Sequence, residues 1–287
     1  MFFKNTVSSW RVRPLIAGTL MALSTSFIFP LSAFGVSYTP PSFKSYQNNY
    51  GFYNHTTPLW YNDFVEIDGN IEPFLKEKAL AKKYAPLVGV DPVLPVWWTY
   101  IETGAPNAKF DSYHYSYCGV ASQETKYRLD INCADPDWGG WQIGYGQQFT
   151  DIREPGLLAT AFKVARGNPN DAEVVRKVGQ NVLNKSGIKK TFPAMTINQV
   201  MNGVNTYYKV DGNYWAYTLM RDPHISMYLL AKEMSWDING GKARGQNYRQ
   251  VMATWGAGYY DAHWGNFSNV LWDVLSLWRM TDAGLRP

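Results

Sequence analysis

The positions of apolar and polar residues along the chain predict a mainly helical protein. Over residues 71–89, IEPFLKEKALAKKYAPLVG, apolar positions recur at helical spacing and a glycine ends the pattern. In the next stretch, Asp91 can cap a helix and Pro92 suits its first position, whereas Gly104 stops it. Glu102 therefore falls in the last turn of this helix.

Further helical patterns fill the second half of the chain, with Gly and Pro between them. The predicted helices are 156–166, 170–185, 196–208, 222–236, 246–256 and 266–280. Strand patterns are weak, and the region 109–133 is where we expect a short hairpin. The prediction is a mainly α protein with a small hairpin or loop region.

The first 35 residues read as a targeting signal. Three basic residues precede the apolar run PLIAGTLMALSTSFIFPLSAFG, and small residues occupy the two positions that a signal peptidase requires. We predict a signal peptide over 1–35 and an exported protein, periplasmic or secreted, with no membrane contact after cleavage. A membrane anchor is the alternative, but Ser, Thr and Pro interrupt the run.

The composition of the next segment changes again. Residues 36–70 are rich in Pro, Asn, Ser and Tyr and show no sustained period, which predicts an extended N-terminal arm or linker. We expect the remaining residues, 71–287, to form a single catalytic domain.

Charge and cysteines narrow the range of partners. The chain has 27 Lys and Arg against 23 Asp and Glu, and without the three bases of the predicted signal the net charge is +1. We therefore expect no nucleic-acid partner. Cys118 and Cys133 enclose a short polar loop in an exported chain, which predicts one disulfide, with two free thiols as the alternative.

Glu102 is the strongest candidate for chemistry. The carbonyl end of a helix disfavours a carboxylate, and Trp98, one turn earlier, helps to desolvate it, so we expect a raised pKa for the Glu102 carboxyl. Such an acid can protonate the leaving oxygen of a glycosidic bond. The alternative interpretation is a solvated glutamate at a helix end.

Three stretches in this order strengthen that hypothesis: GVDPVLPVWWTYIETGAPNA, GGWQIGYGQ and MATWGAGYY. They resemble the three signature motifs of the lysozyme-like lytic transglycosylases and goose-type lysozymes. Glu102 and Thr103 stand where that family has a catalytic Glu and a hydroxyl residue, and Gln142 stands on its substrate-facing Gln. DPHISMYLLAKEM and NFSNVLWDVLSLW are similar to the helices around the third motif, so the resemblance covers roughly residues 72–280.

The resemblance implies a lysozyme-like α+β fold, with a helical catalytic domain and a deep saccharide cleft. It implies cleavage of the β-1,4 bond between N-acetylmuramic acid and N-acetylglucosamine, with Glu102 as acid and then base and with no cofactor or metal. The partners would be peptidoglycan glycan strands and, as a further candidate, a cell-envelope or secretion assembly. The residues expected to contact substrate are Thr103, Trp141, Gln142, Ile143, Tyr145, Trp255, Gly256 and Tyr259.

The chain also departs from the family pattern. Trp255 and Gly256 replace the Tyr and Asn of the third motif, which puts the contacts of those side chains in question. A helical insertion at about 152–208 and the cysteine loop are elaborations.

Asp135 and Asp137 keep a second mechanism open. They could activate water as the additional aspartates of goose-type muramidases do, although CADPDWGG is also ordinary turn chemistry. The one-carboxylate mechanism is favoured here. The same residues are also compatible with a chitin- or chitosan-directed enzyme on this scaffold, or with a non-catalytic wall-binding module. The four histidines show no metal-ligand spacing.

Overall fold

Helices make up most of the described chain, as the sequence predicts. The computed structural model describes residues 38–53, 71–102, 116–117, 137–138, 143–144, 156–203, 210–255 and 259–285. These residues belong to one compact unit, Tyr38–Pro287. The predicted signal peptide, 1–35, lies outside the described residues.

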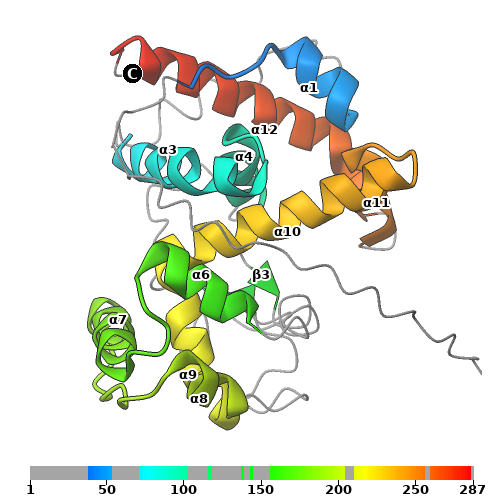
Figure 1. The fold of residues 1–287 in the computed structure, drawn as a ribbon. Coiled ribbons are helices and arrows are strands. Elements are labelled where there is room, and N and C mark those ends of the chain that lie inside the picture. The colour runs from blue at the N-terminus through cyan, green and yellow to red at the C-terminus, as the bar shows by residue number, and fades with distance from the viewer. Residues whose placement is uncertain are drawn as a thin grey trace, which may run out of the picture. The chain divides into compact units, whose positions relative to one another are not determined.

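The helical elements follow the chain as labelled in Figure 1. They are α1 (Phe43–Tyr50), α3 (Glu72–Tyr84), the 3-10 turn η1 (Ala85–Val88), α4 (Val93–Glu102), α6 (Leu157–Ala165), α7 (Ala172–Lys185), α8 (Ile197–Asn202), α9 (Val210–Met220), α10 (Pro223–Ala243), α11 (Tyr248–Trp255) and α12 (Tyr259–Asp282). In the part of the chain that the structure describes, no helix is both long enough and apolar enough to cross a membrane.

A small antiparallel sheet has the order β1-β2-β3. Its strands are β1 (Ser116–Tyr117), β2 (Asp137–Trp138) and β3 (Ile143–Gly144). Of the region 109–133, where a short hairpin is predicted, the structure describes only β1, and the partner strand of β1 in the described chain is β2, which lies beyond that region. Strands of two residues are too short to register as alternation in the sequence.

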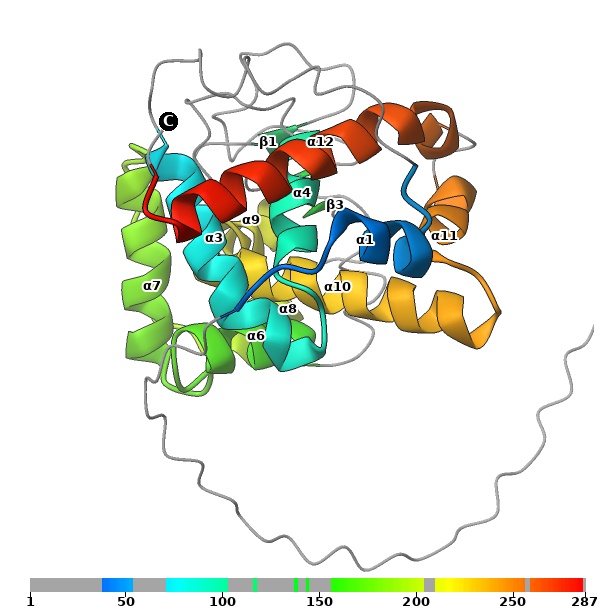
Figure 2. The same ribbon diagram turned by 90° about the horizontal axis from the view of Figure 1, so that it is seen from above.

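Helix α4 lies at the centre of the upper part of the fold in Figure 1 and contacts α3, α10 and α12. Figure 2 shows α12 running over α4, with α3 alongside. All five positions in the first half of α4, 93–97, are buried, among them Val93, Leu94, Val96 and Trp97. The indole of Trp97 also donates a hydrogen bond to the Phe267 carbonyl of α12 at 2.7 Å. The first half of α4 is therefore the part of the helix that enters the core.

The predicted extended arm, 36–70, is wrong for residues 43–50, which form α1. Ser42 caps this helix by accepting from the Ser45 amide at 3.3 Å, and Gly51 ends it at φ 83°. Phe43 and Tyr46 are buried in the common core. The helix escapes a periodicity search because it gains its burial from distant segments rather than from a regular apolar stripe. Residues 54–70 lie outside the described residues.

The predicted helical insertion, 152–208, contains α6, α7 and α8. Helix α6 packs against α10, and both α7 and α8 pack against α9. Helix α9 itself is missing from the helices predicted from the sequence. These helices lie below α10 in Figure 1. Asp171 caps α7, and Thr196 forms a capping box with Gln199 at α8, so local signals fix both starts.

Candidate functional site

The candidate site begins at Glu102, the last residue of α4. One turn earlier, the ring of Trp98 stacks on Tyr260, the second residue of α12, with centroids 5.7 Å apart and planes 25° apart. Positions 98 and 102 share one face of the helix because they are four residues apart. The last turn of α4 therefore lies beside the start of α12.

This contact brings two of the three sequence motifs together. Helix α11 ends at Trp255, α12 begins at Tyr259, and the two helices pack against each other. The stretch TWGAGYY thus joins α11 to α12 at the same corner where α4 ends. Sequence reasoning missed Tyr260, although a pair of tyrosines directly after the glycines of TWGAGYY was the available signal.

Helix α4 is held from its core side by a cluster of aromatic rings around Trp97. Phe52, Trp264 and Tyr248 have ring centroids 4.9, 5.9 and 6.2 Å from that of Trp97, all with edge-on geometry. Such pairs are worth about 0.5–1.5 kcal/mol each beyond their burial. Three separate segments therefore hold the helix that ends in Glu102.

The first turn of α4 is anchored by Asp91. Its Oδ1 accepts hydrogen bonds from the Tyr38 hydroxyl at 2.5 Å, the Tyr46 hydroxyl at 2.9 Å and the Val93 amide at 2.9 Å. Burial, together with the charge of Asp91, raises the pKa of both tyrosines, so both hydroxyls keep the proton that they donate. The N-terminal segment thus fixes the start of the candidate catalytic helix.

Tyr100 adds a neutral phenol close to the end of α4. Burial and, after it, the nearby charge of Glu77 raise the pKa of Tyr100. Glu77 belongs to α3 and is itself buried. An acid and a phenol thus face the α3–α4 contact, and nothing in their sequence spacing marks them as a pair.

The other predicted site residues divide into two groups. The structure gives backbone positions for Asp137 in β2 and Ile143 in β3, and it pairs Asp137 with Gly144. The aspartate position is therefore directly opposite the second motif. The remaining predicted residues lie outside the described residues, namely Thr103, Cys118, Cys133, Asp135, Trp141, Gln142, Tyr145 and Gly256.

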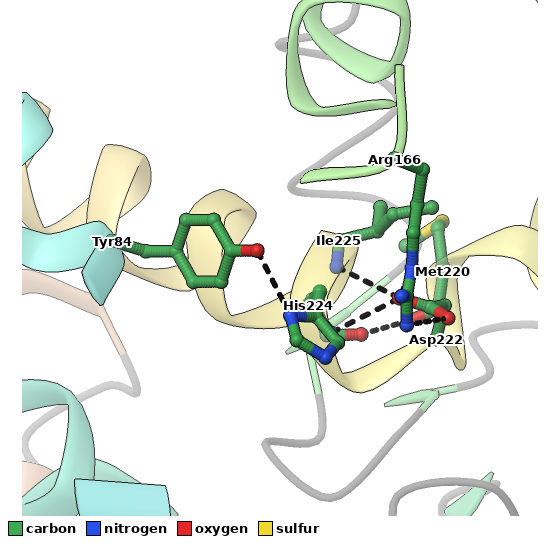
Figure 3. A network of polar contacts seen from close by, with 7 residues as sticks. Tyr84, Arg166, Met220, Asp222, His224 and Ile225 are labelled. Carbon is green, nitrogen blue, oxygen red and sulfur yellow. Dashed lines mark hydrogen bonds and ion pairs between the residues drawn. The ribbon is translucent and has the colours of Figure 1, made fainter. Parts of the chain in front are cut away.

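A second polar cluster joins α3, α6 and α10 (Figure 3). Arg166 binds Asp222 through two hydrogen bonds, 2.9 Å from Nε to Oδ1 and 2.6 Å from Nη2 to Oδ2. Asp222 also caps α10 by accepting from the His224 and Ile225 amides. The Tyr84 hydroxyl lies 2.9 Å from His224 Nδ1.

This cluster has the chemistry of a structural junction. Burial, and then the charge of Arg166, lower the pKa of His224, which keeps the ring neutral. The Ser226 hydroxyl donates to the Met220 carbonyl and closes the turn before α10. Arg166, Asp222, Tyr84 and Ser226 each have a hydrogen-bond partner within the fold. Across the described ranges, no three His, Cys, Asp or Glu side chains gather into a group that could hold a metal ion.

Comparison with known proteins finds no matching family model, no matching curated protein and no matching solved structure. The candidate site therefore rests on the residues and contacts described above.

Proposed function

We propose that this protein is an exported lytic transglycosylase that cleaves the MurNAc-β-1,4-GlcNAc bond of peptidoglycan, with Glu102 as its catalytic acid and base. One observation carries the proposal. The stack of Trp98 on Tyr260 brings the helix end that carries Glu102 next to the TWGAGYY junction. A glycosidase of this kind needs those two elements on the walls of one saccharide cleft.

The reaction requires only one carboxyl group from the protein. Glu102 donates its proton to the glycosidic oxygen while the bond from that oxygen to C1 of the muramic acid breaks. The C6 hydroxyl of the same sugar then attacks C1, and its proton passes to the Glu102 carboxylate. The products are a free 4-hydroxyl on one fragment and a 1,6-anhydro end on the other, and the enzyme regains its starting protonation state.

The other residues would serve binding and orientation. Thr103 would orient Glu102 or the acetamido group of the sugar, and Gln142 would hydrogen-bond the saccharide beside the scissile bond. Trp255 and Tyr259 flank the α11–α12 junction and would supply apolar faces to sugar rings.

One observation favours a second candidate function, hydrolysis by a goose-type muramidase. The pairing of β2 with β3 sets the backbone of Asp137 opposite Gly144, which belongs to the second motif, GGWQIGYGQ. A carboxylate on that side of the substrate could activate water and give a reducing end instead of an anhydro end.

The proposal is tested by the products that the protein releases from purified peptidoglycan. We expect soluble fragments with 1,6-anhydro ends by mass spectrometry, and reducing ends would identify the hydrolase instead. Glu102→Gln should lower fragment release by about 10²–10⁴-fold, the usual contribution of general acid–base catalysis. Glu72→Gln, which changes an exposed glutamate at the start of α3, is the matched control.

Three outcomes decide between the candidates. Full activity of Glu102→Gln, with an unchanged circular dichroism spectrum, would remove Glu102 from the mechanism. Binding to the wall without any release of fragments by the unmodified protein would indicate a non-catalytic binding module. Loss of activity in Asp137→Asn together with reducing ends would establish the hydrolase.

A further inference from the structure

Positive charge is concentrated in the segment that carries α6, α7 and α8. Residues 156–203 contain seven Lys or Arg and two Asp or Glu, which is a net charge of +5. The mature chain predicted above has a net charge of +1, so the rest of it has −4. A chain that is nearly neutral as a whole therefore has one strongly basic part, and a basic surface attracts anions.

The excess charge is sharpest at the end of α7. Lys185, Lys189 and Lys190 are exposed and lie within six residues of one another; we call these three the lysine edge. The ion pairs of this segment involve other cations, with Arg166 bound to Asp222 and Arg176 bound to Glu173. Among the described residues, no carboxylate forms an ion pair with the lysine edge.

The backbone that presents the lysine edge is held in place by Gln180. Its amide nitrogen donates to the Lys190 carbonyl at 3.1 Å and to Asn184 Oδ1 at 3.0 Å. Its amide oxygen accepts from the Phe192 backbone N–H at 2.9 Å. The nitrogen and the oxygen of this one side-chain amide thus tie the loop after α7 back onto the helix.

Two further contacts fix this turn. The Ile188 amide donates to the Leu183 carbonyl at 2.9 Å, and Gly187 has φ 70°, which closes the end of α7. The Lys190 ammonium lies 4.2 Å from the centroid of the Tyr214 ring in α9. The lysines are therefore presented from an ordered turn, which costs a ligand less ordering entropy than a free tail would.

We infer that the lysine edge is a docking surface for carboxylate groups on the peptide side chains of the wall polymer. This inference rests on the proposed function, which makes a peptide-bearing, carboxylate-rich polymer the substrate. An anionic polymer brings many carboxylates past a fixed cationic turn, so several weak contacts act together.

The surroundings of the lysine edge favour a polymer over a membrane. Basic surfaces that bind anionic lipid usually combine lysines with apolar side chains that enter the bilayer. The large apolar side chains with substantial exposure among the described residues are Tyr53, Leu87, Val164 and Leu285. Val164 of α6 belongs to residues 156–203, but none of the four belongs to α7, to α8 or to the turn that carries the lysine edge. The lysine edge offers charge without an apolar anchor.

The test measures co-sedimentation with insoluble peptidoglycan at low salt, using protein that also carries Glu102→Gln so that the wall stays intact. Neutralising the lysine edge with K185Q, K189Q and K190Q should weaken binding on the order of tenfold, the effect of losing three exposed charge pairs. The matched control neutralises Lys44, Lys76 and Lys242, which are exposed lysines outside the segment. The difference between the two variants should disappear at high salt.

Two modified substrates identify the group that is bound. The first is wall whose carboxyl groups have been converted to amides, and the second is glycan strands whose peptides have been removed by an amidase. Each should bind equally to the protein with its lysine edge intact and to the variant with K185Q, K189Q and K190Q. Equal binding of both variants to intact wall would overturn the inference. Undiminished binding to amidated wall, or stronger lysine-dependent binding to phosphatidylglycerol vesicles than to wall, would also overturn it. Failure of the proposed function is seen separately, as absence of fragments from the protein with Glu102 intact.

Discussion

At the residue scale, Gly179 shows how one small side chain shapes the segment that carries the lysine edge. This glycine lies inside α7, and a Cβ added there would be 2.2 Å from Cδ2 of Phe192. Phe192 is fully buried and packs edge-on against Trp215 with centroids 5.0 Å apart. The glycine is therefore required for the close approach of the loop after α7 to the helix.

Gly179→Ala should destabilise the protein, although alanine is the better helix former by about 1 kcal/mol. Phe192 would have to leave its buried position, and overpacking of this kind typically costs about 1–3 kcal/mol. Gly240→Ala is the matched control, because Gly240 also lies inside a helix and its added Cβ would meet only the flexible end of Arg244 at 3.4 Å. In urea denaturation, Gly179→Ala should have a lower free energy of unfolding than the unmodified protein, and Gly240→Ala should have a higher or an unchanged one. Equal stabilities would contradict the packing argument.

Single residues also show where the candidate site could be predicted and where it could not. The position of Glu102 at the end of a helix followed from local signals, namely the Asp91 cap, the early prolines and the glycine after it. The role of Tyr260 could not be predicted in this way. Its partner Trp98 is 162 positions away in the chain, and only tertiary packing decides which aromatic side chains meet.

At the element scale, the sequence predicted those helices whose ends carry local signals. Helices α3, α4, α6, α7 and α11 lie close to their predicted ranges. Helix α10 extends beyond its predicted end to Ala243, through Gly240 and Gly241. The helix continues through Gly241, and the glycine there makes room for the Val251 side chain. The Cγ2 atom of Val251 would lie 2.5 Å from a Cβ added at Gly241. A glycine needed for packing looks the same in sequence as one that stops a helix.

The contact between α4 and α12 leads to a prediction at the same scale. Tyr260→Ala removes the ring that stacks on Trp98 and should loosen the last turn of α4. If Glu102 acts as proposed, its displacement by about 1 Å is enough to lower turnover on the order of 10²-fold. Tyr260→Phe keeps the ring and should retain most of the activity.

The two Tyr260 variants are compared by their turnover at saturating wall substrate and by their thermal melting temperatures. A positioning role predicts that Tyr260→Ala lowers kcat far more than it raises KM. If the activity of both variants falls in proportion to their folded fraction, Tyr260 has only a structural role.

At the scale of the whole molecule, the cluster in Figure 3 links segments that come from both sides of α10. Tyr84 ends α3, Arg166 follows α6, Asp222 caps α10, and His224 lies in the first turn of α10. Helix α3 packs against α4, whereas α6 begins the segment that carries the lysine edge. The stability of this junction therefore couples the candidate catalytic helices to the proposed docking surface.

The junction should make the stability of the whole protein sensitive to pH through His224. Its pKa in the folded protein is lowered, first by burial and then by Arg166, while Asp222 opposes this and Lys83 adds to it. The unfolded histidine has a pKa of about 6.5. Between the lower folded value and about 6.5 the unfolded chain binds more protons, so the free energy of unfolding falls as the pH is lowered through this window. In the protonated ring Nδ1 can act only as a donor toward the Tyr84 hydroxyl, which lies 2.9 Å away.

His224→Asn removes this titration, so the free energy of unfolding of the variant should fall less than that of the unmodified protein between about pH 7.5 and pH 5.5, the range around the unfolded pKa. All other groups titrate in both proteins, and the difference between the two curves isolates His224. His263→Asn, which changes an exposed histidine of α12 outside this junction, is the control for the replacement of a histidine as such. Urea denaturation at several pH values gives the curves. Parallel curves for His224→Asn and the unmodified protein would mean that the ring is protonated as readily in the folded state as in the unfolded one, and that the junction holds α3 to α10 without depending on a neutral histidine.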